Sequence, residues 1–317
     1  MPIDEVLHHH AHIAACLIDN GWPLAAGPVV GVALDGLGYG KQGDNGELWG
    51  GEFAIADYTS FKRVGTFKPV ALLGGEKATH EPWRNTYAHL MAELKWPSFT
   101  MNYNELELHQ FLTAQPRALL DNMLAKNINS PLATSCGRLF DAVAAAMGIC
   151  REQAAYEGQG AIELEALVDG EVMRFEDEAL GYPFGIPRLK GSHMPYVEPL
   201  ARWTALLGDL ILKTPVPTMA ARFHKGLAKV IVAMVDKLAR AHDEDKPLRT
   251  VALSGGVFQN KVLLEAVTQR LRAAGFTVLT HHRVPCNDGG LALGQAAVAA
   301  ARAMAVANQN QETSACA

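Results

Sequence analysis

The chain has 317 residues, of which 49% are hydrophobic and 19% are charged, and its formal net charge is −5. This length predicts one large bilobal domain or two domains. The mildly acidic balance, without a long basic run, argues against nucleic acid as the main partner.

Cysteine usage and the N-terminal residues predict the compartment. The five cysteines are widely spaced and form no CxxC pair, which argues against a disulfide framework and against a zinc–cysteine site. The first residues carry no basic start and no apolar signal core. No stretch approaches the ~20 apolar residues that a membrane span needs. We therefore expect a cytoplasmic protein without a membrane segment.

Strands and helices alternate along the chain, which predicts an α/β fold. Residues 8–20 predict a helix that ends at Asn20-Gly21. The apolar, β-branched run 28–35 is typical of a buried strand. The glycine-rich segment from Asp35 to Gly46 predicts a tight connection to a second strand, residues 47–57, in a hairpin.

The second half continues the alternation of helices and strands. The predicted elements are helices 137–147 and 215–241, strand 249–254, helix 261–274, strand 276–280 and helix 289–306. Residues 308–317 are polar and small, and they predict a disordered tail.

The first predicted helix carries the run His8-His9-His10-Ala11-His12. Four residues turn through ~400° of helix, so His8 and His12 lie ~40° apart on one face, while His9 and His10 point elsewhere. Two imidazoles on one face chelate a single metal ion. The alternative is a helix that is rich in histidine and pairs with carboxylates.

Glycines follow two of the predicted strands. After Asp35, Gly36 and Gly38 would let backbone amides approach a phosphate, and Asp35 itself could hold a metal or a water; the alternative is a plain Asp-Gly hairpin turn. Gly255 and Gly256 stand between a strand and a helix, which suits phosphate or nucleotide contact but equally suits a tight βα turn. Neither segment is a GxGxxG or a P-loop motif.

Two aspartates occupy positions with two interpretations each. Asp288 directly precedes the last predicted helix, where either a metal ligand or an N-cap would sit. Asp141 falls inside an otherwise apolar helix and needs a polar partner, which a ribose hydroxyl or a backbone amide could supply.

The order of the motifs is more specific than any one of them. The segments HHHAHIAA, ALDGLGYG, EPWR, GRLFDAVAAAMG, YEGQGAIELE, AARFHKGLA, SGGVFQN and NDGGLALGQA resemble the HypF carbamoyltransferases of [NiFe]-hydrogenase maturation, in their C-terminal transferase domain. The resemblance runs from about residue 3 to about residue 303. It implies an actin-like, two-lobed ATPase fold, with a partial N-terminal lobe over residues 1–130 and a C-terminal lobe over residues 131–307.

The resemblance also implies functional residues. In that family the HxxxH pair binds a metal, here His8 and His12, and the aspartate of NDGG completes the site, here Asp288. Asp35 lies beside them as a further ligand and as the candidate catalytic residue. The candidate nucleotide-binding residues are Gly36, Gly38, Asp141, Gly158, Gly255, Gly256 and Asn260.

The chemistry of that family proceeds in stages. Carbamoyl phosphate and ATP give carbamoyl-adenylate in a YrdC-type domain, and the transferase domain passes the carbamoyl group to the C-terminal cysteine thiolate of HypE, for the cyanide ligands of the hydrogenase. The resemblance therefore implies ATP or carbamoyl-adenylate and HypE as ligand and partner. Imidazole plus carboxylate suits zinc or iron(II), and magnesium would accompany the nucleotide. A homodimer is left open.

The sequence departs from this family in its extent. Full-length relatives carry acylphosphatase, zinc-finger and YrdC-like domains and a DLHPDY-like segment before HHHAH, none of which occurs in this sequence. We therefore expect an N-terminal lobe without its first strands, and a chain that performs only the transfer half-reaction. Two alternatives stay open: a threonylcarbamoyl transferase acting on tRNA, and a non-catalytic nucleotide-binding scaffold for HypE.

Overall fold

Strand β1 (Val29–Tyr39) lies in the middle of the sheet in the computed structural model, which describes residues 3–40, 48–243 and 245–315. It pairs antiparallel with β2 on one side and parallel with β7 on the other. The order along the sheet is β4-β5-β2-β1-β7-β8, and β3 pairs with β2 and with β6. These strands are β2 (Leu48–Ala56), β3 (Phe61–Phe67), β4 (Val70–Ala71), β5 (Leu132–Ala133), β6 (Tyr196–Val197), β7 (Thr250–Ser254) and β8 (Thr277–Leu279).

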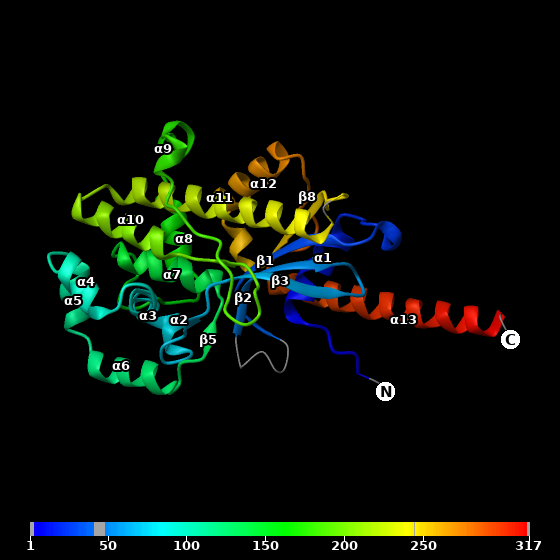
Figure 1. The fold of residues 1–317 in the computed structure, drawn as a ribbon, viewed down its shortest axis with the longest axis horizontal. Helices are drawn as coiled ribbons and strands as arrows, with labels where there is room; N and C mark the ends of the chain where they lie inside the picture. Colours follow the sequence, from blue (N-terminus) through cyan, green and yellow to red (C-terminus); the bar gives the residue numbers. More distant parts are fainter. Residues whose placement is uncertain (1–2, 41–47, 244, 316–317) are drawn as a thin grey trace.

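Helices cover both faces of this sheet (Figure 1). The α-helices are α1 (His8–Asp19), α2 (Lys77–His80), α3 (Trp83–Glu93), α4 (Trp96–Tyr103), α5 (Glu107–Thr113), α6 (Arg117–Lys126), α7 (Cys136–Ala146), α8 (Gln159–Ala166), α9 (Gly170–Phe175), α10 (Leu200–Ile211), α11 (Val216–His242), α12 (Lys261–Ala273) and α13 (Leu291–Ala315). The short 3₁₀ turns are η1 (Leu24–Ala26), η2 (Glu178–Leu180), η3 (Gly256–Gln259) and η4 (Asp288–Gly290).

Side chains of β1 alternate between two hydrophobic cores, because successive residues of a strand point to opposite faces of the sheet. Val30, Val32 and Leu34 lie in the larger core, together with buried residues of α7, α11 and α12. Val29 and Ala33 lie in the smaller core, with buried residues of α1 and α13. The strand therefore packs against helix α1 on one face and against the larger hydrophobic core on the other.

The predicted mixed α/β order and its main elements are confirmed, and the hairpin differs from the prediction. Asp35-Gly36 is not the predicted turn, because β1 continues to Tyr39. Its pairing with β2 shifts register between Leu34 and Gly38, which marks a bulge that glycines accommodate. The remainder of the predicted connection, residues 41–47, lies outside the described residues.

Helix α13 differs from the prediction in its length. It continues to Ala315, so helical backbone extends into the segment for which the sequence predicts a disordered tail. Its alanine content favours helix, because alanine has the highest intrinsic helix propensity. Figure 1 shows the end of α13 extending away from the sheet.

The expectation that no segment matches a membrane span also needs correction. Residues 288–308 are long and apolar enough by length and composition, with a mean hydropathy of 1.4. One such helix is weak evidence for a span, because core helices pass the same test. Here 28% of the window is buried inside the protein, and Ala297, Val298 and Ala301 lie in the smaller core.

The predicted boundary between lobes at residue 130 stays a prediction. Strands β1 and β2 precede that boundary and β7 and β8 follow it, yet all four belong to one sheet. The residues placed around the end of β1 therefore come from both halves of the chain.

The crossing of α1 and α13 predicts a sharp difference between two glycines. A Cβ at Gly294 would lie 1.9 Å from the carbonyl oxygen of Ala11, whereas a Cβ at Gly208 in α10 would meet nothing within 4 Å. We expect Gly294→Ala to lower the free energy of unfolding by about 1–3 kcal/mol, because the two helices must separate. Gly208→Ala should raise it by about 0.5–1 kcal/mol. Urea denaturation measures both, and equal effects would contradict the close crossing.

Candidate functional site

Four side chains from three separate segments meet beyond the end of the buried part of β1. Helix α1 supplies His8 and His12, β1 supplies Asp35, and the turn η4 supplies Asp288. One ligand atom of each lies within 4.8 Å of the others. The Nε2 atoms of the two histidines are 3.2 Å apart, and each lies 3.4 Å from Oδ1 of Asp288.

The carboxylate of Asp35 is oriented by two backbone amides. The N–H groups of Gly36 and Gly256 donate to its Oδ1, at 2.9 and 3.1 Å. Its Oδ2 is thereby turned to the Nε2 atoms of His8 and His12, at 3.0 and 3.1 Å. One carboxylate oxygen of Asp35 is therefore bound by backbone amides, and the other contacts the two histidines.

The cluster fits a divalent cation in both spacing and chemistry. Ligands bound at ~2.0–2.1 Å around a tetrahedral zinc lie about 3.3 Å from one another. The nitrogen–nitrogen and nitrogen–oxygen distances here range from 3.0 to 3.4 Å. Two imidazoles and two carboxylates are also a donor set that zinc and iron(II) accept. The residues present therefore fit the predicted metal.

Electrostatics within the cluster favour the ionised form of Asp35. Burial by itself would raise the pKa of this carboxyl, but the hydrogen bonds from His12 and His8 hold it well below its ordinary value. Burial opposes protonation of His12, yet its hydrogen bonds with Asp288 and Asp35 raise its pKa. The carboxylates thus attract positive charge to this point, which is what a cation-binding site requires.

The two other histidines of the run have different surroundings. The Nε2 atom of His10 lies 2.8 Å from the carbonyl oxygen of Asp57. The ring of His9 is buried, and its centroid is 5.7 Å from that of Trp49; neither of its ring nitrogens has a hydrogen-bond partner within the described ranges. Burial and the adjacent His8 and His12 lower the pKa of His9 well below its ordinary value, so it stays neutral.

The predicted glycines have packing reasons in this structure. A Cβ at Gly38 would lie 2.6 Å from the ring of His9 and 2.7 Å from that of His8, so this glycine lets α1 approach β1. Gly255 has a φ of +104°, and its Cβ would lie 2.1 Å from the carbonyl oxygen of Leu34. These close approaches bring the histidine helix and the turn after β7 to Asp35. Nucleotide contact at these glycines stays a prediction.

A second polar cluster surrounds Arg138, next to Gly36. The Nε atom of Arg138 is 3.0 Å from Oδ2 of Asp141, and its Nη2 is 3.2 Å from Oε1 of Glu157. That Glu157 oxygen would lie 2.8 Å from a Cβ at Gly36. Burial, partly offset by Arg138, raises the pKa of Asp141 to about 6. Two predicted nucleotide residues, Gly36 and Asp141, thus lie around one guanidinium.

Arg138 and Glu157 were not singled out from the sequence, although both stand inside quoted motifs. Arg138 is buried in α7 among apolar residues. A charged residue inside that apolar pattern was the feature of the sequence that could have marked it as functional. Glu157 precedes Gly158, the predicted residue with a φ of +81° at the N-cap of α8. The left-handed backbone there explains a glycine at 158 without a ligand.

Asn260 caps a helix, whereas Asp288 does not. Oδ1 of Asn260 accepts from the N–H of Leu263 and caps α12, and its Nδ2 lies 2.9 Å from Nε2 of His224. A nucleotide contact at Asn260 would have to share these bonds. In the turn η4 the cap is Asn287, which accepts from Gly289, so the capping alternative for Asp288 is wrong and its carboxylate is left to the metal cluster.

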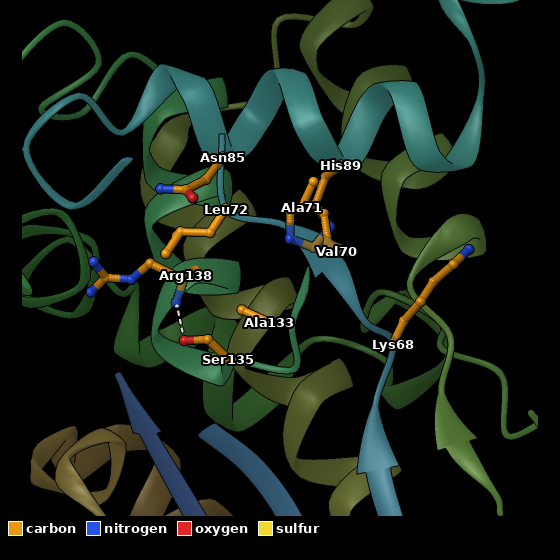
Figure 2. A pocket seen from close by; sticks show the side chains of 9 residues that line it. All are labelled: Lys68, Val70, Ala71, Leu72, Asn85, His89, Ala133, Ser135 and Arg138. Carbon is orange, nitrogen blue, oxygen red and sulfur yellow. Dashed lines mark hydrogen bonds between the residues drawn. The ribbon is translucent and has the colours of Figure 1, made fainter. Parts of the chain in front are cut away.

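A narrow pocket is lined by residues of β4, α3 and β5 and by the start of α7, and Figure 2 shows this lining. Its volume of ≈ 10 Å³ is about what one water needs. The N–H of Arg138 donates to Oγ of Ser135 there, at 3.0 Å, which caps α7. None of the four metal-cluster residues lines this pocket, but Arg138 of the second polar cluster does.

Comparisons with known proteins identify the family of the chain. Residues 31–295 match the family described as carbamoyltransferase, Kae1-like domain, second subdomain. The chain is 40% identical over 303 residues to the carbamoyltransferase HypF of Rhodobacter capsulatus, covering 95% of this chain and 36% of that protein. It is 34% identical over 306 residues to a carbamoyltransferase HypF homolog of Cupriavidus necator, covering 95% of this chain and 71% of that protein.

A solved structure extends the match to the fold. The crystal structure of full-length HypF in the phosphate- and nucleotide-bound form has a TM-score of 0.79 and 32% sequence identity, covering 94% of this chain and 43% of that one. The class is therefore the Kae1-like carbamoyltransferase domain. The chain belongs to the HypF carbamoyltransferase family. It spans 36% of the length of the Rhodobacter capsulatus relative.

The helical-face argument predicts unequal effects of three histidine substitutions. His8→Ala and His12→Ala should each lower bound metal to below about half of wild type, because each removes one ligand of a four-ligand set. His10→Ala should retain most of it, because His10 contacts Asp57 instead. Dialysis against zinc followed by inductively coupled plasma mass spectrometry measures the content, with circular dichroism as the folding control. Equal losses in all three variants would refute the cluster.

Proposed function

We propose that this chain transfers a carbamoyl group from carbamoyl-adenylate to the C-terminal cysteine thiolate of HypE. The observation that carries the proposal is the cluster of His8, His12, Asp35 and Asp288, placed against the glycine turn after β7 in a chain of the HypF family. The proposal includes the actin-like two-lobed arrangement, a cytoplasmic location and nucleotide contacts at the predicted glycines and at Asp141.

The reaction is an acyl transfer from a mixed anhydride. The thiolate sulfur of HypE attacks the carbamoyl carbon, a carbon–sulfur bond forms, and the carbon–oxygen bond to the AMP phosphate breaks, so that AMP leaves with the bonding electrons. A divalent cation held by the four cluster residues would neutralise the negative charge on the phosphate of the leaving AMP. Asp35, fixed by the amides of Gly36 and Gly256, keeps its Oδ2 on the side of the histidines without reorganising during the reaction.

The polar cluster around Arg138 suits the nucleotide half of the substrate. Nη1 of this buried guanidinium has no hydrogen-bond partner in the described part of the chain, and the neighbouring Asp141 is a ready acceptor. A buried unpartnered donor is costly unless a ligand satisfies it. Arg138 and Asp141 would therefore bind and orient the adenylate.

The cysteines of the chain favour a direct transfer without an enzyme thioester. Burial is the first cause that raises the thiol pKa at each of the four described cysteines, to about 11 at Cys150. A thiol with a raised pKa is a weak nucleophile near neutral pH. The partner's own cysteine is then the nucleophile that the chemistry needs.

Transfer to HypE can be measured directly. The chain, loaded with zinc or iron(II), is incubated with chemically made carbamoyl-adenylate and HypE, and mass spectrometry locates the added carbamoyl group. Asp35→Asn should slow transfer by about 100-fold or more, because a carboxylate ligand and its charge are lost. Asp236→Asn, at a partly exposed position on α11, is the matched control and should leave the rate unchanged.

The same experiment separates the alternatives. HypE without its C-terminal cysteine should stay unmodified. A stable complex with HypE but no transfer by a metal-loaded, folded chain would favour the scaffold and contradict the proposal. Binding and modification of tRNA in place of HypE would favour the threonylcarbamoyl alternative.

A further inference from the structure

A line of buried polar side chains runs behind His12, away from the metal cluster. Oγ of Ser254, at the end of β7, lies 3.4 Å from Nδ1 of His12 and 2.8 Å from Nε2 of His281. Nδ1 of His281 lies 3.9 Å from Oδ2 of Asp19. Ser254 has no exposed surface, and the side chains of His281 and Asp19 are 5% and 1% exposed.

The order of donors and acceptors along this line has one consistent direction. A neutral His12 that presents a bare Nε2 to a cation carries its proton on Nδ1, and this N–H can donate to Oγ of Ser254. The hydroxyl hydrogen of Ser254 then points to Nε2 of His281, which is nearer than its other acceptor, the carbonyl oxygen of Cys286 at 3.4 Å. His281 in turn carries its proton on Nδ1, on the side of Asp19, although this nitrogen has no hydrogen-bond partner among the described residues and the two groups are 3.9 Å apart.

The far end of the line is anchored to the fold. The carboxylate of Asp19 accepts the backbone N–H of His282 at 2.6 Å and that of Arg283 at 3.1 Å. The adjacent Asn20 donates its Nδ2 to the carbonyl oxygen of Thr280, at 2.8 Å. The last turn of α1 therefore holds the loop that carries His281, while the first turns of the same helix carry the metal-cluster histidines.

A serine, a histidine and an aspartate in this order also occur in nucleophilic triads, but the geometry excludes that role here. Ser254 is fully buried, and its hydroxyl faces His12 instead of a cleft. A serine that no substrate can reach cannot attack one. The remaining role is that of a second shell behind a metal ligand, which fixes ring orientation and tautomer.

We propose that Ser254 and His281 are positioning residues that hold the His12 ring in the tautomer whose Nε2 faces the divalent cation. This inference rests on the metal site of the proposed function, and it assigns residues outside the four ligands. Burial lowers the pKa of His281 to about 4, which keeps its Nε2 available as an acceptor at neutral pH.

Metal affinity measures the proposal without any transfer assay. Zinc is titrated against a chromogenic competing chelator at neutral pH, and the variants are first checked for folding by circular dichroism and thermal unfolding. Ser254→Ala and His281→Leu should weaken zinc binding by about 10–100-fold, whereas His281→Gln, whose amide oxygen replaces Nε2 as acceptor, should stay within about threefold of wild type. His282→Ala, at the exposed neighbouring position, should leave the affinity unchanged.

A spectroscopic readout separates positioning from a general packing effect. In zinc-loaded protein labelled with ¹⁵N-histidine, the His12 signals, assigned by their loss in His12→Ala, should report zinc on Nε2 and a hydrogen on Nδ1. Ser254→Ala should speed the exchange of that Nδ1 hydrogen with solvent, because its acceptor is lost. Unchanged zinc affinity in folded Ser254→Ala and His281→Leu, or an equal loss in His281→Gln and His281→Leu, would overturn the proposal. If wild type binds no zinc, the metal site of the proposed function fails. If wild type binds zinc and folded Ser254→Ala and His281→Leu bind it equally tightly, only this inference fails.

Discussion

The carboxylate of Asp35 is the point on which the geometry of the site depends. One of its oxygens accepts two backbone N–H groups, and the other faces two imidazoles. For both oxygens of Asp35 to be bound in this way, the end of β1, the helix α1 and the turn after β7 must approach one another within hydrogen-bond distance. Residues that lie more than 200 positions apart in the sequence thus become neighbours, because β1 is hydrogen-bonded to β7 and packed under α1.

Close backbone approach is what makes this meeting possible, and glycine permits it. Gly38 lets the histidine helix lie on β1, Gly255 passes against Leu34, and Gly294 lets α13 cross α1 at Ala11. A side chain at any of these positions would push a neighbouring element away from α1 or β1, which carry His8, His12 and Asp35. The metal cluster is therefore specified by packing as much as by the four side chains that form it.

Much of the fold followed from local patterns in the sequence, whereas the four residues of the cluster were brought together as one site by the resemblance to the HypF family. The apolar run before Asp35, the long stripe of α11 and the spacing of His8 and His12 are all signals within one segment. The features that escaped prediction depend on contacts between segments: the continuation of β1 beyond Asp35 through a bulge, the use of Asn260 as a cap bonded to His224, and the line from His12 through Ser254 to His281. No local period places residues 12, 254 and 281 together: the parallel pairing of β7 with β8 brings 254 near 281, and the packing of α1 on the sheet brings 12 to them.

Anomalous X-ray diffraction from crystals grown with zinc and ADP would test the central claim most directly. The account predicts one zinc peak at ~2.0–2.2 Å from Nε2 of His8, Nε2 of His12 and Oδ2 of Asp35. It also predicts that Oδ1 of Asp35 keeps its bonds to the amides of Gly36 and Gly256. A peak bound elsewhere on the chain, or an Asp35 carboxylate turned away from the histidines in the metal-bound state, would contradict it.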